Sequence, residues 1–229
     1  MSDPRIDDLR RAGTIMLDPL TPAQVGEVLA FLKGRDVFNS RHVVQGDVDG
    51  FSSWEAAAAS NVVAWRLGDA VLCPHLLERA LAMTDFAAEY LGVATPYLYS
   101  MNVFCTRPGQ PVRPDIQDWH RDGDDVRFLP MFFYLTDVGP DARQELRFEG
   151  GGAAIEGPAG TTFFSDTMRE HRGLKPRRAE RIIAWARWGI SDPPASYQWD
   201  RLQPIDKALL GERYPADQRL RESIKLLAK

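Results

Sequence analysis

Four residues in the second half of the chain have types and spacings that could bind a metal ion and a carboxylate. His120 and Asp122 are two positions apart, His171 follows about fifty positions later, and Arg181 lies ten positions beyond that. Two histidines and one carboxylate are the ligand set of a facial non-haem Fe(II) site, which leaves three coordination positions open. The set contains no thiolate, which would favour zinc or an iron–sulfur cluster. A guanidinium offers a planar, permanently charged fork, so Arg181 could hold the far carboxylate of 2-oxoglutarate.

A barrel of strands would position these side chains. Residues i and i+2 of a strand point to the same side, so His120 and Asp122 should project together, and His171 should come from a distant strand that faces them. The turn-like segment 173–178 predicts a hairpin that returns Arg181 to the barrel end of His171. Alternation then places three side chains of the last strand on one face: Arg181, Ile183 and Trp185.

Hydrophobic periodicity predicts helices near both ends of the chain. Thr21 as N-cap and Pro22 begin a helix that Gly34 ends, and a second helix covers 76–91. The short Ala-rich segment 52–59 and the tail from residue 201 also favour helix, the tail with a break near Tyr214 and Pro215. Aromatic and β-branched residues predict strands in five segments: 97–106, 127–138, 153–156, 161–165 and 181–190.

This order of elements predicts a mainly β fold with flanking helices. We expect a double-stranded β-helix (a jelly roll, cupin-like) over about residues 95–190. An N-terminal helical part at about 20–92 and a C-terminal helical tail at about 201–229 should buttress it. All 229 residues are then expected to form a single domain.

Composition and charge exclude several classes of protein. Apolar residues make up 44% and charged residues 26% of the chain, which argues against disordered and fibrous classes. A net charge of −4 and a pI near 5.6 provide no basic field for nucleic acid. No apolar run approaches the ~20 residues needed to span a bilayer, and the charged N-terminus does not look like a signal peptide. Cys73 and Cys105 form no CxxC pair, so we expect a cytoplasmic protein without a disulfide framework.

Over roughly residues 14–190 the chain resembles the phytanoyl-CoA dioxygenase family of Fe(II)- and 2-oxoglutarate-dependent oxygenases. The matching strings are WHRD at 119–122, FFYLTDV at 132–138, and HRG at 171–173 with Arg181 following. A Leu-Thr-Pro-x-Gln helix start, as at 20–24, is also typical of that family. The resemblance implies a jelly-roll core, Fe(II) held by His120, Asp122 and His171, and Arg181 on the far carboxylate of 2-oxoglutarate. It also implies that O2 hydroxylates a small molecule while 2-oxoglutarate is decarboxylated to succinate and CO2.

The resemblance extends to residues around the co-substrate and to one departure. It implies that Phe132 lines the 2-oxoglutarate pocket and that Asn102 adds a polar contact. Many relatives carry Ser or Asn where this chain has Gly173. The co-substrate cradle is therefore altered, or another hydroxyl replaces the missing one: that of Tyr99, Thr161 or Ser165. Halogenating relatives lack the metal-binding carboxylate, so the presence of Asp122 disfavours halogenation.

Substrate contacts and rival functions are less constrained by the sequence. The residues that could contact substrate are Arg113, Gln117, Tyr134 and Arg147. Asp124 and Asp125 could face an amine-bearing substrate or be ordinary loop carboxylates. One rival keeps the fold but not the chemistry: a cupin-like metal-binding isomerase or a catalytically degenerate jelly-roll binding protein. A second rival is a protein side-chain hydroxylase. We expect a monomer or homodimer acting on a small molecule, without nucleic-acid or membrane partners.

Overall fold

The computed structural model describes residues 3–38, 50–51, 55–57, 62–108, 118–192 and 204–228. The helices, including the 3-10 segments η1 and η3, are α1 (Pro4–Ala12), α2 (Pro22–Lys33), η1 (Glu55–Ala57), α3 (Leu67–Leu72), α4 (Leu76–Leu81), α5 (Thr84–Leu91), η3 (Lys207–Arg213) and α7 (Gln218–Ser223). The strands are β1 (Thr14–Leu17), β2 (Val37–Phe38), β3 (Gly50–Phe51), β4 (Val62–Trp65), β5 (Tyr97–Thr106), β6 (Phe128–Tyr134), β7 (Gln144–Phe148), β8 (Gly151–Ile155), β9 (Thr162–Ser165), β10 (Glu170–Gly173) and β11 (Arg181–Gly189). Within these ranges no helix is both long and apolar enough to cross a membrane.

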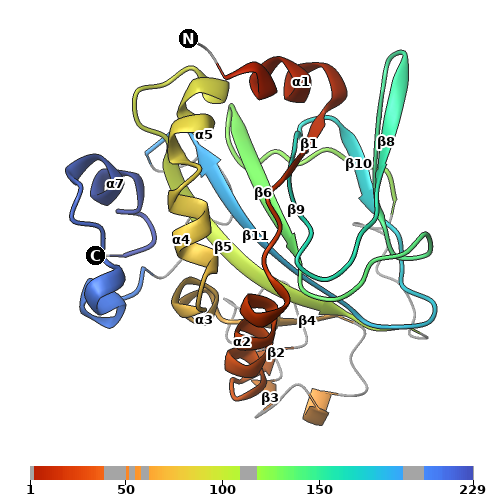
Figure 1. The fold of residues 1–229 in the computed structure, drawn as a ribbon, viewed down its shortest axis with the longest axis horizontal. Coiled ribbons are helices and arrows are strands. Elements are labelled where there is room, and N and C mark those ends of the chain that lie inside the picture. The colour runs from red at the N-terminus through yellow and green to blue at the C-terminus, as the bar shows by residue number, and fades with distance from the viewer. Residues whose placement is uncertain are drawn as a thin grey trace.

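The strands form two antiparallel sheets that enclose an apolar interior. The larger sheet has the order β1-β9-β6-β11-β5-β4-β2-β3, and the smaller has the order β10-β7-β8 (Figure 1). Between the sheets lies a buried cluster: Ala64, Phe104, Phe132, Tyr134, Val138, Ala142, Leu146, Ile155, Phe163 and Ile183. Two facing antiparallel sheets with helices on one side make a jelly roll, as the sequence predicts.

Strand β11 runs through the middle of the larger sheet and separates two environments. Its alternate residues Ile182, Ala184, Ala186 and Trp188 pack into the core on the helix side of the sheet. Ile183 and Trp185 face the interior between the two sheets instead. Strand alternation therefore also directs Arg181, at the start of the strand, and Arg187, near its end, toward the interior.

The helices cover the outer face of the larger sheet (Figure 1). A capping box at Thr21 begins α2, with the side chains of Thr21 and Gln24 each bonded to the other's backbone N–H. Apolar side chains from α2, α4 and α5 join the helix-side core. One of them, Phe86 of α5, stacks on Phe164 of β9 with ring centroids 4.9 Å apart. The helices therefore pack on the outer face of the larger sheet, and the inner face of that sheet is turned toward the interior between the two sheets.

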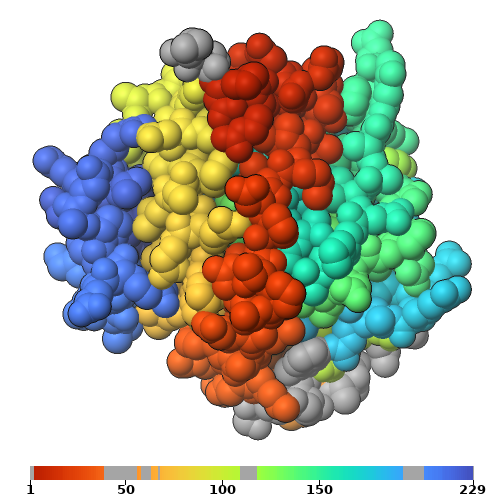
Figure 2. Space-filling model, in the orientation of Figure 1, coloured from red at the N-terminus to blue at the C-terminus, as the bar shows by residue number. Residues whose placement is uncertain are grey.

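The C-terminal segment packs on the helical layer rather than extending away. Figure 2 shows it (blue) against the surface of the α4–α5 region (yellow). Arg213 donates to the backbone carbonyls of Val71 and Leu72, both at 2.7 Å, and the Ser223 hydroxyl donates to the Pro96 carbonyl at 2.6 Å. The predicted helical character of this tail and its break at Tyr214 are confirmed by η3 and α7.

Two local predictions are wrong. The helix expected over 76–91 is two helices, because α4 ends at Leu81 and α5 begins at Thr84. Thr84 and Asp85 have short polar side chains, which favour a new helix start over a helix interior. The hairpin expected at 173–178 is also wrong, because β10 pairs with β7 in the smaller sheet while β11 lies between β6 and β5 in the larger. The turn therefore crosses from one sheet to the other.

Candidate metal centre

A backbone bridge brings the two histidines together. The N–H of His120 donates to the carbonyl of His171 at 3.0 Å, and the N–H of His171 donates back at 2.9 Å. Two residues on, the N–H of Asp122 donates to the carbonyl of Thr167 at 2.9 Å. The segment that carries His120 and Asp122 thus lies along the beginning of β10, and the two imidazole rings have centroids 4.2 Å apart.

The side-chain atoms of His120, Asp122 and His171 form a compact donor set. Nε2 of His120 is 3.7 Å from Oδ1 of Asp122, and Nε2 of His171 is 3.7 Å from Oδ2. One ligand atom from each residue lies within 4.8 Å of the others. Two imidazole nitrogens and a carboxylate oxygen at this spacing suit a divalent transition metal.

Hydrogen bonds behind the rings fix which nitrogen is free. Nδ1 of His120 contacts the Asp118 carbonyl at 2.9 Å, and Nδ1 of His171 contacts the Arg169 carbonyl at 3.0 Å. A carbonyl only accepts, so each Nδ1 carries the proton and each Nε2 keeps its lone pair. Both lone pairs are therefore available on the side of Asp122, and the rings are held in the tautomer that a metal requires.

The protonation states also fit a metal. Burial lowers the pKa of His171, although the nearby Asp122 carboxylate opposes this shift. Burial by itself raises the pKa of Asp122, but the charge of Arg187, with His171, lowers it to a net value below the ordinary one. At neutral pH the pair is thus a neutral imidazole and an ionised carboxylate, the forms that bind metal.

Arg187, Asp124 and Tyr99 form a buried chain of contacts behind Asp122. Nη2 of Arg187 donates to Oδ2 of Asp122 at 3.0 Å, and Nη1 donates to Oδ2 of Asp124. The Tyr99 hydroxyl donates to the same Asp124 oxygen at 3.0 Å. Arg187 was not predicted as a site residue, and Asp124 was expected either to face an amine-bearing substrate or to be an ordinary loop carboxylate. Arg187 lies six positions after Arg181 on an otherwise apolar strand, so both side chains should point to the same face. This pattern could have identified Arg187 as a site residue.

Asp125 serves the fold rather than the metal centre. Its carboxylate accepts from the backbone N–H groups of Ile190 and Ser191 at 2.7 and 2.9 Å and from the Ser191 hydroxyl at 2.6 Å. Both Asp124 and Asp125 are only 6% exposed. Neither is a solvated loop carboxylate, because each has buried partners.

Arg181 is a buried cation whose described surroundings supply no anion. It is 5% exposed, and its Nη1 donates to the carbonyls of Ala142 at 2.5 Å and Leu174 at 3.2 Å. Its Nε is buried without a hydrogen-bond partner, and no carboxylate of the described residues forms an ion pair with it. Burial lowers the pKa of Arg181. An unpaired buried charge is costly, so this position is suited to an incoming anion.

Gly173 makes room for this guanidinium. A Cβ at position 173 would lie 3.0 Å from Nη2 and 3.2 Å from Nη1 of Arg181. Opposite Gly173 in the β7–β10 register stands Gln144, whose side-chain oxygen is buried without a partner among the described residues. Gln144 was not predicted as a site residue, since only the β7–β10 register brings it opposite Gly173.

The other predicted residues are distributed between the interior and the outer face. Phe132 packs inside with Phe163 and Trp185, at centroid distances of 5.2 and 6.1 Å. The Tyr134 hydroxyl donates to the Ile155 carbonyl at 2.9 Å, and Asn102 Nδ2 donates to the Ser100 hydroxyl at 2.5 Å. These contacts place the three predicted side chains as follows: Phe132 and Tyr134 in the interior cluster, and Asn102 opposite Trp185 in the β5–β11 register.

Arg147 does not share the face of the triad. Leu146 pairs with His171 and Arg147 pairs with Glu170, so alternation turns Arg147 to the outside of the smaller sheet. There it forms an ion pair with Glu170 at 2.8 Å and stacks over the Trp119 ring. Of the proposed replacement hydroxyls, Thr161 donates to the Pro158 carbonyl at 2.7 Å, Ser165 lies buried in β9, and Tyr99 faces Asp124. Arg113 and Gln117 lie outside the described residues.

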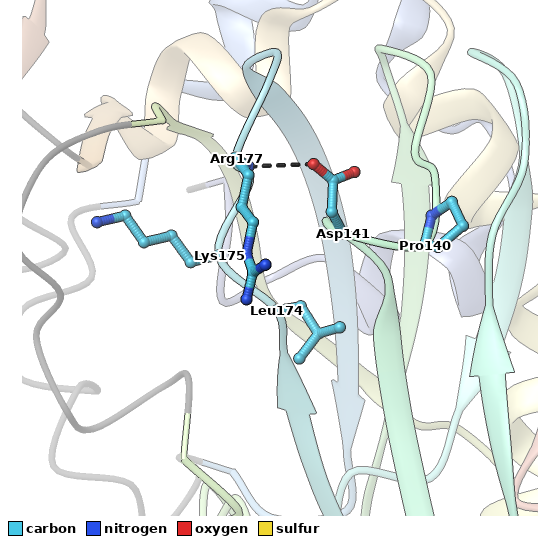
Figure 3. Close-up of a pocket in the computed structure, with 5 residues that line it drawn as sticks. All are labelled: Pro140, Asp141, Leu174, Lys175 and Arg177. Carbon is cyan, nitrogen blue, oxygen red and sulfur yellow. Dashed lines mark hydrogen bonds between the residues drawn. The ribbon is translucent and has the colours of Figure 1, made fainter.

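A separate hollow of about 450 Å³ opens at the turns behind Arg181. Figure 3 shows its lining side chains: Pro140, Asp141, Leu174, Lys175 and Arg177. The only hydrogen bond drawn among them joins the backbone N–H of Arg177 to the Asp141 carboxylate at 3.3 Å. None of the three metal-binding candidates lines it, so it is distinct from the metal centre.

Comparisons with known proteins identify the fold of this chain but do not assign the chain to a family. No family model matches the chain. No curated protein matches it either. Solved structures do match: the non-heme alpha-ketoglutarate-dependent carbocyclase SnoK from nogalamycin biosynthesis is 15% identical, with a TM-score of 0.56 over 89% of this chain and 92% of its own.

Two further structures resemble this chain to a similar degree. HygX from Streptomyces hygroscopicus, solved with nickel, 2-oxoglutarate and hygromycin B bound, is 8% identical, with a TM-score of 0.54 over 83% of this chain and 88% of its own. EctD from S. alaskensis, solved with bound Fe, is 16% identical, with a TM-score of 0.53 over 82% of this chain and 76% of its own. At these identities the comparisons show that this chain shares the jelly-roll fold of those oxygenases.

Proposed function

We propose that this protein is a non-haem Fe(II)- and 2-oxoglutarate-dependent oxygenase of the phytanoyl-CoA dioxygenase-like group. In the proposed reaction a small molecule is hydroxylated by one oxygen atom of O2. The other oxygen atom enters 2-oxoglutarate, which leaves as succinate and CO2. The observation that carries the proposal is the pairing of a His-Asp-His donor set with a buried, anion-free arginine on inward-facing positions of one barrel.

The donor set supports a ferrous ion held by Nε2 of His120, Nε2 of His171 and one oxygen of Asp122. A bound Fe(II) would supply coordination sites for the 2-oxo acid and for O2, together with the electrons that activate O2. The protein's part is to orient both rings through the hydrogen bonds at Nδ1, and to favour the neutral form of His171 and the charged form of Asp122 through the pKa shifts of these two residues. The aromatic wall around Phe132 would exclude water from the interior.

Arg181 supports 2-oxoglutarate as the co-substrate. Its Nη1 is anchored to two backbone carbonyls, while its Nε has no partner among the described residues. A carboxylate that reached Nε and Nη2 would therefore satisfy a buried donor that has no acceptor among the described residues. Tyr134 lies close enough that Arg181 affects its pKa: burial raises the pKa of Tyr134 and the guanidinium opposes the rise. An isomerase or a degenerate binding protein would have no use for such a clamp.

A small molecule is the substrate class we favour over a protein side chain. Two structures with this fold are described with small molecules bound: HygX with hygromycin B, and the epimerase SnoN, 15% identical with a TM-score of 0.53, with alpha ketoglutarate and a nogalamycin compound. Hydroxylation is the outcome we propose by default, and ring closure and epimerisation are the alternatives, because SnoK and SnoN are described as a carbocyclase and an epimerase on the same fold. We further expect a cytoplasmic monomer or homodimer.

Succinate formation tests the proposal. Purified protein would be incubated with Fe(II), ascorbate, 2-oxoglutarate and O2, and succinate would be measured with and without candidate substrates. We expect slow substrate-independent succinate formation by the wild type and none by Asp122→Ala or Arg181→Ala. Arg178→Ala, on the exposed turn before β11, is the matched control and should behave as the wild type. Undiminished succinate formation by either site variant would overturn the proposal.

A further inference from the structure

Two arginines point inward from β11, and their surroundings differ in charge. Arg181 has backbone carbonyls as its hydrogen-bond partners among the described residues. Arg187, six positions on, has two carboxylates: Asp122 through Nη2 and Asp124 through Nη1. It is 8% exposed, and its guanidinium lies 5.2 Å from the centre of the Trp185 ring. The Nε of Arg187, like that of Arg181, is buried without a partner among the described residues, but the charge of Arg187 is already neutralised by two carboxylates.

The contact with Asp122 distinguishes the two oxygens of that carboxylate. Oδ2 accepts from Arg187 at 3.0 Å and also lies 3.7 Å from Nε2 of His171, whereas Oδ1 lies 3.7 Å from Nε2 of His120 and receives no bond from Arg187. A metal-binding carboxylate that has one oxygen occupied by a guanidinium offers the other to the metal. Such hydrogen bonds behind the ligands orient them and tune metal affinity.

Arg187 is in turn held from behind. Asp124 is 6% exposed and accepts from both Arg187 and the hydroxyl of Tyr99, which is 2% exposed. Tyr99 itself packs against Phe128 and Leu226, so its hydroxyl position is set by the core. The chain of contacts therefore runs from the apolar core through Tyr99, Asp124 and Arg187 to the metal carboxylate.

We propose that Arg187 is a positioning residue that holds Asp122 as a single-oxygen metal ligand, and that Asp124 and Tyr99 hold Arg187 in that role. This inference rests on the proposed metal centre. It concerns how many oxygens of the Asp122 carboxylate bind the metal, and it leaves unchanged which residues are the metal ligands. Keeping Asp122 to one metal bond preserves the open coordination positions that the co-substrate and O2 need.

Metal affinity tests this role without relying on turnover. Ni(II) binding to the purified metal-free chain would be measured by calorimetry at fixed pH for the wild type and its variants. Arg187→Lys keeps the charge but lacks the rigid planar fork that holds the two carboxylates in a fixed geometry, and we expect it to weaken Ni(II) binding by roughly 10–100-fold. Arg187→Met should also weaken binding. If Arg187 were only a neighbouring positive charge, its removal would instead strengthen the binding of a cation, and Arg187→Lys would bind as the wild type does.

Two further variants keep the test decisive if Arg187→Met does not fold. Tyr99→Phe removes one hydroxyl from the chain of contacts and should give a smaller loss in the same direction. Asp125→Asn is the matched control, since Asp125 has the same 6% exposure but contacts backbone and Ser191 rather than Arg187. It should lower the melting temperature without lowering Ni(II) affinity.

The outcomes separate the two proposals. Failure of the wild type to bind Ni(II) would overturn the metal centre itself. Wild-type binding with unchanged affinity in Arg187→Lys and Tyr99→Phe would overturn only the positioning role. A loss of affinity in Asp125→Asn equal to that in Arg187→Lys would also overturn it, because general destabilisation would then explain both.

Discussion

Adding a single methyl group at Gly173 should weaken 2-oxoglutarate binding without affecting the metal. In Gly173→Ala the new Cβ would lie 3.0 Å from Nη2, 3.2 Å from Nη1 and 3.5 Å from Cζ of Arg181. Ordinary contacts begin near 3.4 Å, so the guanidinium must retreat by about 0.4 Å. Leu174 follows Gly173 directly, so this retreat also lengthens the 3.2 Å bond from Nη1 to the Leu174 carbonyl beyond a useful distance.

The loss can be expressed as an affinity. A guanidinium displaced from its anchors loses alignment with the 2-oxoglutarate carboxylate. A hydrogen bond from a charged group to that carboxylate would contribute about 1.5–3 kcal/mol, and each 1.4 kcal/mol corresponds to about a factor of ten in Kd. Since the anchor to Ala142 at 2.5 Å remains, we take the lower figure and expect the Kd for 2-oxoglutarate to rise about tenfold.

Anaerobic titration of the Fe(II) protein with 2-oxoglutarate, followed by its visible absorption, would measure this Kd. Gly26→Ala is the control, because a Cβ there has no neighbour within 4 Å and Gly26 lies in α2, away from the site. An unchanged 2-oxoglutarate Kd in Gly173→Ala would show that Arg181 does not bind the co-substrate against Gly173, and an equal loss of Fe(II) affinity would show that the effect is not specific to the co-substrate.

Three more outcomes are expected of the fold and the site. Burial lowers the pKa of His171 in the folded protein, so as the pH falls the imidazole is protonated in the unfolded chain before it is protonated in the folded one. The contribution of His171 to stability is therefore fully present above about pH 6.5 and is lost as the pH falls below it. Thermal melts of the metal-free protein at pH 7.5 and 5.5 should show this decline, and His171→Gln should show less of it. Thr21→Ala removes the capping box of α2 and should cost about 1 kcal/mol in urea unfolding; a change near zero would contradict the assigned cap. Gly189→Ala would place a Cβ 2.5 Å from Oδ2 of Asp125 and should lower stability by about 1–3 kcal/mol, and an unchanged melting temperature would show that this loop yields freely.

The parts of the site that depend on local backbone geometry could be predicted from the sequence. The i, i+2 spacing of His120 and Asp122 predicted that they project together from a strand. Their ligand atoms do lie together, but His120 forms only an isolated bridge and Asp122 lies outside any strand. Alternation along β11 likewise placed Ile183 and Trp185 on one face, which the interior cluster confirms. The strands at 97–106 and 181–190 were predicted because aromatic and β-branched residues dominate them.

Features set by pairing between distant segments were not predictable in the same way. The turn at 173–178 indicates a reversal but does not say which sheet the next strand joins, so the hairpin was wrong. β1 and β4 are short, and each becomes a strand by pairing with a neighbour distant in the sequence, β9 for β1 and β5 for β4. β7 carries charged residues and pairs with its neighbour β8 on one side and with the more distant β10 on the other. Arg187 and Asp124 meet only because the loop after Asp122 folds inward, and no local pattern encodes that contact.

The central claim is that the His-Asp-His set and Arg181 together form a working 2-oxoglutarate site. The most direct measurement is the anaerobic titration of the Fe(II)-loaded wild type with 2-oxoglutarate, monitoring the visible metal-to-ligand charge-transfer band. We predict that the band appears and saturates, and that Arg181→Ala binds Fe(II) normally but forms the band only at much higher 2-oxoglutarate concentration. If the wild type bound iron but formed no band, the proposed 2-oxoglutarate site would be wrong. That result would favour a metal-binding jelly roll without oxygenase chemistry.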